Sequence, residues 1–290
     1  MDVAKLAAAL AACDGRVEQR LLGAYDWPGR STTIAIPTTA GTGSEATRTC
    51  VVSDDAGRKL WAWGEALLPA LVVLAPELTR GLPAHLTAAT GIDAFVHALE
   101  AASSRRVTPL ARAAALEAVR RIAASLPRVA CEPGDLEARL RLQEAAHLAG
   151  VAIDSAGTGP AHNLGHALGS LYGIPHGVAV GVGLRATLGF SLEADPEPFA
   201  ELAQCMDPGA KPDALPGLVA SLYAEAGFDA AAARWADTEV DPAALAACMQ
   251  AQENLPMAHN GPRSPASGDW QRLARSARVV LRGEALVEGS

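Results

Sequence analysis

The sequence lacks any run of about 18 apolar residues, which is the length that a membrane-spanning helix requires. Its longest candidate, ALLPALVVLAP at 66–76, is short and is interrupted by Pro69. Positive charge is also scarce, since 24 basic residues stand against 32 acidic residues and give a formal charge of −8. Binding a polyphosphate needs clustered cations. The sequence therefore predicts neither a membrane span nor a nucleic-acid partner.

A regular cysteine pattern is missing as well. The five cysteines are scattered and odd in number, and none of them forms a CxxC pair. This predicts reduced, mostly buried thiols in a cytoplasmic protein. The segment LAAC at 10–13 resembles an export cleavage box, but the apolar stretch 6–12 is short and Asp2 offsets the charge of Lys5. We therefore expect no export signal.

The character of the chain changes near residue 80. Before this point we expect a helix and three β-runs, at 3–13, 32–36, 49–53 and 70–74. After it the apolar residues follow a helical period, and no convincing β-run occurs. The predicted helices span 84–104, 107–126, 135–150, 160–172, 176–188, 197–206, 213–226, 241–252 and 268–281. The sequence thus predicts a small α/β domain (1–79) followed by an all-helical domain (80–290).

Two clusters of metal-binding side chains stand out within the helical part. Asp93 and His97 are four residues apart, which places them on one face of a helix. His162 and His176 are fourteen apart, with His166 between them. The segment 173–175 (GIP) should end one helix, so that His176 can turn back toward His162 from the start of the next. One carboxylate and three imidazoles suit a divalent cation such as Fe²⁺ or Zn²⁺.

The alternative is that each histidine is simply packed or solvated. The two clusters together, with glycines and a proline at their joints, favour the shared metal. Three other histidines have no metal-binding residues at a suitable spacing and are predicted to be structural or solvated: His85, His147 and His259.

A Gly/Thr loop, PTTAGTGSE at 37–45, follows the first β-run. Its glycines allow close backbone approach, and its threonines offer hydroxyls, so it could cradle a phosphate or the polar edge of a nucleotide. It is neither GxGxxG nor a P-loop, and a plain turn explains it equally well. Lys59, one of only three lysines, could pair with a phosphate or could be a solvated lysine beside a turn.

These motifs resemble the iron-containing (group III) alcohol dehydrogenase family. The matching stretches are MDVAK (1–5), IPTTAGTGSEAT (36–47), PELTRGLPAHLTAATGIDAFVHALEAASS (76–104) and GPAHNLGHALGSLYGIPHGVA (159–179). The resemblance implies a Rossmann-like nucleotide-binding domain followed by a helical domain, the architecture shared with dehydroquinate synthase-like proteins. It also implies an NAD- or NADP-linked enzyme that interconverts an alcohol with an aldehyde or ketone, and a homo-oligomer such as a dimer.

The resemblance assigns roles to residues of this sequence. It implies that Asp93, His97, His162 and His176 bind the metal. It places His166 near the reactive carbon as a catalytic residue. It places Thr38, Thr39, Gly41, Thr42 and Lys59 along the NAD(P) site.

The family carries further strands and a diphosphate-gripping GGGS loop immediately before the segment that matches residues 1–5. This sequence does not include them, so we expect a truncated α/β domain with an open sheet edge. Either the start codon is misassigned or the truncation is real.

Three hypotheses follow. The first is a metal-dependent NAD(P) alcohol/aldehyde oxidoreductase, either complete or impaired by the truncation. The second is a non-catalytic, metal-binding remnant that associates through its open edge. The third is another enzyme of the same fold, such as a glycerol dehydrogenase-like protein. The combination of TTAGTGSE with the Asp/His/His/His pattern favours the first.

Overall fold

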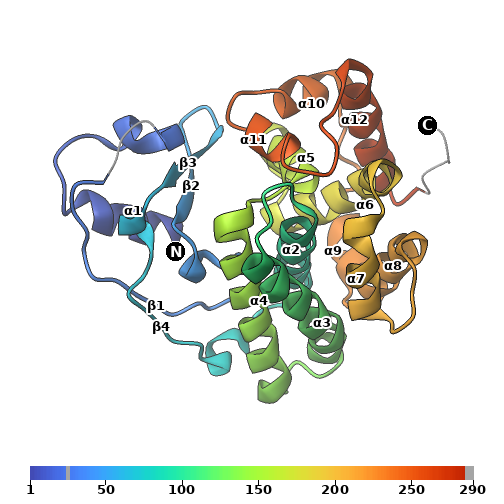
Figure 1. Ribbon diagram of the computed structural model, residues 1–290, viewed down its shortest axis with the longest axis horizontal. Coiled ribbons are helices and arrows are strands. Elements are labelled where there is room, and N and C mark those ends of the chain that lie inside the picture. The colour runs from blue at the N-terminus through green and yellow to red at the C-terminus, as the bar shows by residue number, and fades with distance from the viewer. Residues whose placement is uncertain (24–26, 285–290) are drawn as a thin grey trace.

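The computed structural model describes residues 1–23 and 27–284. All its strands lie before residue 73, and Figure 1 shows them with the first helix on one side of a body of packed helices. The elements of this smaller part are α1 (Asp2–Leu10), β1 (Ile34–Ala35), β2 (Thr49–Ser53), β3 (Lys59–Trp63) and β4 (Leu71–Val72). Strands β1 and β4 pair in parallel, and β2 and β3 form an antiparallel hairpin.

The three predicted β-runs are present, but only one has the predicted length. The run at 49–53 is β2, whereas those at 32–36 and 70–74 shorten to the two-residue strands β1 and β4. Strand β3 was not predicted, because Lys59 was considered only as a phosphate partner or as a solvated residue beside a turn. Its partner β2 makes it a strand, and the intervening turn is closed by the Asp54 carboxylate, which accepts backbone N–H groups from Ala56 and Arg58.

One face of the parallel pair is exposed and apolar. Ile34 lies opposite Leu71 in the register, and Ile36 and Val73, two residues further along each segment, are exposed as well. Their exposed fractions are 61%, 54%, 48% and 40%, respectively. Parallel sheets are normally covered on both faces. This patch, which we call the exposed sheet face, therefore has the composition of an interior surface.

The helical body begins at α2, and within the described residues it contains no strand. Its helices are α2 (Ala84–Ser103), α3 (Pro109–Cys131), α4 (Leu136–Ala156), α5 (Pro160–Tyr172), α6 (His176–Ala194), α7 (Glu197–Met206), α8 (Leu215–Glu225), α9 (Phe228–Ala233), α10 (Pro242–Met249), α11 (Leu255–Ala258) and α12 (Ser267–Leu281). Nine of the predicted ranges correspond to helices. The short helices α9 and α11 were missed, because one or two turns show too little periodicity.

Several helices run past their predicted ends, and α3 does so through a proline, since it was predicted to stop at residue 126. The helix instead runs through Pro127 to Cys131. Proline removes one backbone hydrogen bond and costs about 3 kcal/mol in a helix interior. Here Leu126 and Val129, which are 0% and 1% exposed, keep the last turns packed on the core and offset that cost.

Helix α2 lies at the centre of the body and is buried on nearly all sides (Figure 1). It contacts α3, α4 and α6. One apolar cluster fills the space between α2, α3, α4 and α7, and a second joins α5 and α6 to α10 and α12. Because α2, α5 and α6 pack directly on one another, polar residues on their facing sides are brought together away from solvent.

The MDVAK segment fixes α1 to the end of the Gly/Thr loop. The Nζ atom of Lys5 donates hydrogen bonds to the backbone carbonyls of Ser44, Thr47 and Thr49 at 2.6, 2.7 and 2.9 Å. The Lys5 side chain is buried, and its burial lowers its pKa. One turn earlier, the carboxylate of Asp2 accepts a hydrogen bond from the Ser44 hydroxyl. Helix α1 therefore fixes the C-terminal end of the Gly/Thr loop through these hydrogen bonds.

The expectation of mostly buried thiols is wrong. Of the five cysteines only Cys50 is buried, whereas Cys131 is exposed and the other three are intermediate. Burial raises the pKa of the Cys50 thiol to about 12. Among the described residues, no helix is both long enough and apolar enough to cross a membrane.

Candidate metal centre

Three helices position the predicted metal ligands. Asp93 and His97 lie one turn apart on α2, His162 lies in the first turn of α5, and His176 is the first residue of α6. Helix α5 is followed by Gly173, whose φ of +67° suits glycine, and Pro175 precedes α6. The predicted break at 173–175 is therefore present.

Close helix packing brings these residues together. A Cβ atom on Gly177, next to His176, would lie 2.3 Å from the Ala89 carbonyl oxygen of α2. A Cβ atom on Gly165 of α5 would meet the backbone of Val180 in α6 at 2.9 Å. Glycine at these two positions lets α6 approach both neighbours at backbone distance.

The four side chains converge on one point. The Oδ1 atom of Asp93 lies 3.5 Å from Nε2 of His176, 3.7 Å from Nε2 of His162 and 3.9 Å from Nε2 of His97. The four donor atoms all lie within 4.8 Å of one another. Two ligands bound tetrahedrally to one ion, each about 2.1 Å away, would be about 3.4 Å apart. Small side-chain movements would thus suffice for all four to reach a shared cation.

The hydrogen bonding also fits a cation. Asp93 Oδ1 and His162 Nε2 are buried, and no described residue makes a hydrogen bond with either atom. Buried polar atoms are rarely left unpaired, because each costs about 1–3 kcal/mol. A carboxylate oxygen and imidazole nitrogens are ligands for Zn²⁺ and Fe²⁺. The donor set therefore fits a divalent cation, and the cation would satisfy both atoms.

Most of these groups are already in the protonation state that binds metal. Burial lowers the pKa of His97 to about 4 and that of His176 to about 3. Burial opposes ionisation of Asp93, but its three imidazole neighbours outweigh this effect and hold its pKa below the usual range. Burial likewise opposes protonation of His162, but the carboxylates of Glu100 and Asp93 raise its pKa to about 9. Binding of a cation would release that proton.

His166 and Lys59 adjoin the cluster. The His166 ring centroid lies 5.3 Å from that of His176 and 6.3 Å from that of His162. Burial and the nearby charges of His176 and Lys59 lower the pKa of His166 well below its usual value. Lys59 Nζ lies 3.3 Å from His176 Nδ1, so this lysine is not the solvated residue of the alternative interpretation. Burial lowers its pKa.

The Gly/Thr loop also packs against α2. Thr38 and Thr42 are exposed and Thr39 is half-buried, whereas Gly41 is buried. A Cβ atom on Gly41 would lie 2.7 Å from Cβ of Thr90, which precedes Asp93 on α2 by three residues. The loop thus packs on α2 beside the donor cluster and leaves the side chains of Thr38 and Thr42 accessible, although Thr42 Oγ1 accepts a hydrogen bond from the Ser44 backbone N–H.

A residue that the sequence analysis missed completes the cluster. Glu100 is buried on α2, and its Oε2 atom lies 2.6 Å from Nδ1 of His162. Its spacing was a usable signal, because it follows Asp93 by seven residues and His97 by three and so shares their helix face.

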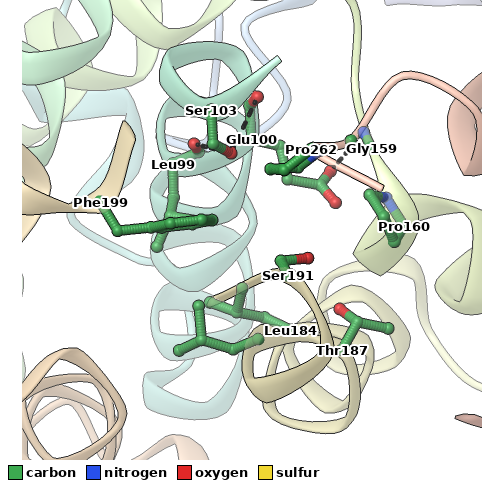
Figure 2. A pocket seen from close by; sticks show the side chains of 12 residues that line it. Leu99, Glu100, Ser103, Gly159, Pro160, Leu184, Thr187, Ser191, Phe199 and Pro262 are labelled. Carbon is green, nitrogen blue, oxygen red and sulfur yellow. Dashed lines mark hydrogen bonds between the residues drawn. The ribbon is translucent and has the colours of Figure 1, made fainter. Parts of the chain in front are cut away.

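The other three histidines do not join the cluster. His85 and His259 are exposed, and the partly buried His147 lies 3.4 Å from Oε1 of Glu45. A small cavity of about 10 Å³ borders Glu100 and is lined by residues such as Ser103, Thr187 and Phe199 (Figure 2). This volume holds at most about one water molecule, so the cavity is not a substrate site.

Family models match both parts of the chain. The model described as "Iron-containing alcohol dehydrogenase" matches residues 1–76, and the model described as "Fe-containing alcohol dehydrogenase family, C-terminal" matches residues 87–265. The chain therefore belongs to the iron-containing alcohol dehydrogenase family, and the fold predicted from the resemblance is confirmed.

Curated relatives match over part of the chain. A 1,3-propanediol dehydrogenase of Klebsiella pneumoniae is 42% identical over 176 residues, which cover 60% of this chain and 45% of the relative. An NAD-dependent methanol dehydrogenase of Bacillus methanolicus is 37% identical over 174 residues, or 60% of this chain and 46% of the relative. These matches thus span less than half the length of the relatives.

Solved structures match over nearly the whole chain. An alcohol dehydrogenase from Oenococcus oeni is 30% identical with a TM-score of 0.85, covering 95% of this chain and 73% of that structure. A sulfoacetaldehyde reductase from Bifidobacterium kashiwanohense, solved in complex with NAD⁺, is 27% identical with a TM-score of 0.84. The match covers 96% of this chain and 73% of that structure.

Proposed function

We propose that this chain carries the metal site and part of the cofactor site of an NAD- or NADP-linked oxidoreductase that interconverts an alcohol with an aldehyde or ketone. The observation that carries the proposal is the buried convergence of Asp93 with His97, His162 and His176 in a member of this family. A divalent cation held there, Fe²⁺ or Zn²⁺, supplies a Lewis acid that polarises the oxygen of the reacting group.

The chain's own residues have complementary roles in this proposal. His166 stands beside two of the ligands, and its lowered pKa keeps the ring neutral. A neutral imidazole can accept a proton at one ring nitrogen as it gives up the proton of the other, so His166 can relay a proton to water while its ring stays uncharged. Lys59 lies against His176, which supports a place at the reacting, nicotinamide end of the cofactor. Thr38, Thr39, Gly41 and Thr42 would line its polar edge.

Titration of the Zn²⁺-loaded chain with NADH and NADPH, followed by nicotinamide fluorescence, tests the cofactor part. We expect micromolar binding of one or both cofactors and several-fold weaker binding for Lys59→Met, because that variant loses the charge beside the site. Lys211→Met serves as the control, since Lys211 is exposed. No binding at millimolar cofactor would contradict an oxidoreductase role for this chain.

The exposed sheet face favours a second hypothesis, in which the chain binds a metal ion without catalysis and associates with another polypeptide. Ile34 and Leu71 are the most exposed residues of that face. A patch of apolar side chains on a sheet is prone to self-association. We expect the purified chain to form dimers or larger species in sedimentation velocity experiments.

The double variant Ile34→Lys/Leu71→Lys should shift the chain toward the monomer, because two buried cations would oppose the contact. Leu110→Lys is a matched control, since Leu110 is 76% exposed at the start of α3, in the helical body. Equal association of all three proteins would show that the exposed sheet face is not the contact.

A further inference from the structure

Glu100 makes three hydrogen bonds that all lead to the start of α5. Besides the His162 contact, its Oε2 atom accepts the backbone N–H of Gly159 at 2.8 Å. Its Oε1 atom accepts the backbone N–H of Ala161 at 2.6 Å. Figure 2 shows the side chain reaching from α2 toward Gly159 and Pro160. The carboxylate is 5% exposed, so water does not compete for these donors.

These contacts cap α5 from another helix. The first N–H groups of a helix have no partner within it and carry partial positive charge, so a carboxylate is a favourable partner. The residue at the N-cap of α5 is Gly159, which has no side chain to make this bond itself. A Cβ atom there would lie 2.9 Å from Glu100 Oε1, so glycine also makes room for the carboxylate.

The bond to His162 fixes which ring nitrogen faces the other ligands. Nδ1 must carry a hydrogen to donate to Glu100, which leaves Nε2 directed at Asp93 Oδ1, 3.7 Å away. Glu100 and Asp93 lie on the same helix, seven residues apart. One rigid element therefore carries both a donor atom of the cluster and the group that orients a second donor.

We propose that Glu100 is a positioning residue of the metal site, which orients His162 through Nδ1 and sets the start of α5 relative to α2. This inference rests on the proposed metal-binding function. Partners that orient a metal-bound histidine typically change metal affinity by about 10–100-fold when removed. Glu100 itself would not touch the cation.

Titration with Co²⁺, followed by its visible absorption, tests this role without any activity measurement. We expect the wild-type chain to bind one Co²⁺ and Glu100→Gln to bind it about 10–100-fold more weakly, with a changed spectrum. Glu100→Asp keeps the charge but is shorter by one methylene, and should recover part of the affinity. Glu225→Gln removes the same charge from an exposed site and should match the wild type.

The outcomes separate this inference from the function on which it rests. If the wild-type chain binds Co²⁺ and Glu100→Gln binds it with the same affinity and the same spectrum, the role of Glu100 is overturned and the metal site still stands. Failure of the wild-type chain to bind Co²⁺ would overturn the metal site and this inference together. If Glu100→Gln does not fold by circular dichroism, Glu100→Asp decides: a weaker affinity and altered spectrum support the role, and wild-type values refute it.

Discussion

Replacing His162 with alanine is expected to abolish retention of iron or zinc by the purified protein. The variant loses one of four donor atoms that lie within 4.8 Å of one another. It also leaves the Glu100 carboxylate without the imidazole that it contacts at 2.6 Å. Loss of even an outer partner costs about 10–100-fold in affinity, so loss of a direct ligand should cost more. Elemental analysis after dialysis provides the measurement.

The matched control for this prediction is His166→Ala. His166 is the next histidine along the same helix, but it is not among the four grouped donors. We expect it to retain metal at the wild-type level while any turnover falls. Full metal occupancy in His162→Ala would rule out the ligand assignment, and equal loss in both variants would place His166 among the ligands.

Replacing Lys5 with methionine is expected to lower the free energy of unfolding by about 2–4 kcal/mol. Methionine fills similar space but leaves three backbone carbonyls, those of Ser44, Thr47 and Thr49, without their ammonium donor. Each buried acceptor that loses its partner costs about 1–3 kcal/mol. Relief from burying a charge, seen in the lowered pKa of Lys5, offsets part of that sum.

Denaturant unfolding followed by circular dichroism measures this change, with Lys211→Met as the control. Lys211 is exposed, and its replacement should change stability by less than about 0.5 kcal/mol. Since Lys5 holds the segment that follows the Gly/Thr loop, Lys5→Met should also weaken NADH binding if that loop lines the cofactor site. Equal stability of the two variants would mean that water replaces the ammonium group.

Much of the helical body could be predicted from apolar spacing, because a buried helix face repeats every three or four residues. The clusters around Asp93 and His162 were visible for a related reason. Polar residues one helical turn apart share a face whatever the helix packs against. The break at 173–175 followed from local backbone preferences of glycine and proline. These features need only short-range information.

Strand β3 and the end of α3 could not be predicted in this way. Lys59 is in a strand because β2 supplies hydrogen-bond partners, and it reaches His176, which is 117 residues away. Helix α3 continues through Pro127 because neighbouring helices bury its last turns. Both outcomes depend on contacts between segments that are distant in the chain.

The sequence by itself determined the helix faces, the turn before His176 and the chemical type of every donor, since these follow from residue identity and local geometry. Only the tertiary structure decided that the three helices meet, that Glu100 caps α5 and orients His162, and that Lys59 lies at the cluster. The physical reason is packing: glycines at 165 and 177 let the helix backbones touch, and burial then keeps water from competing for the polar groups between the helices.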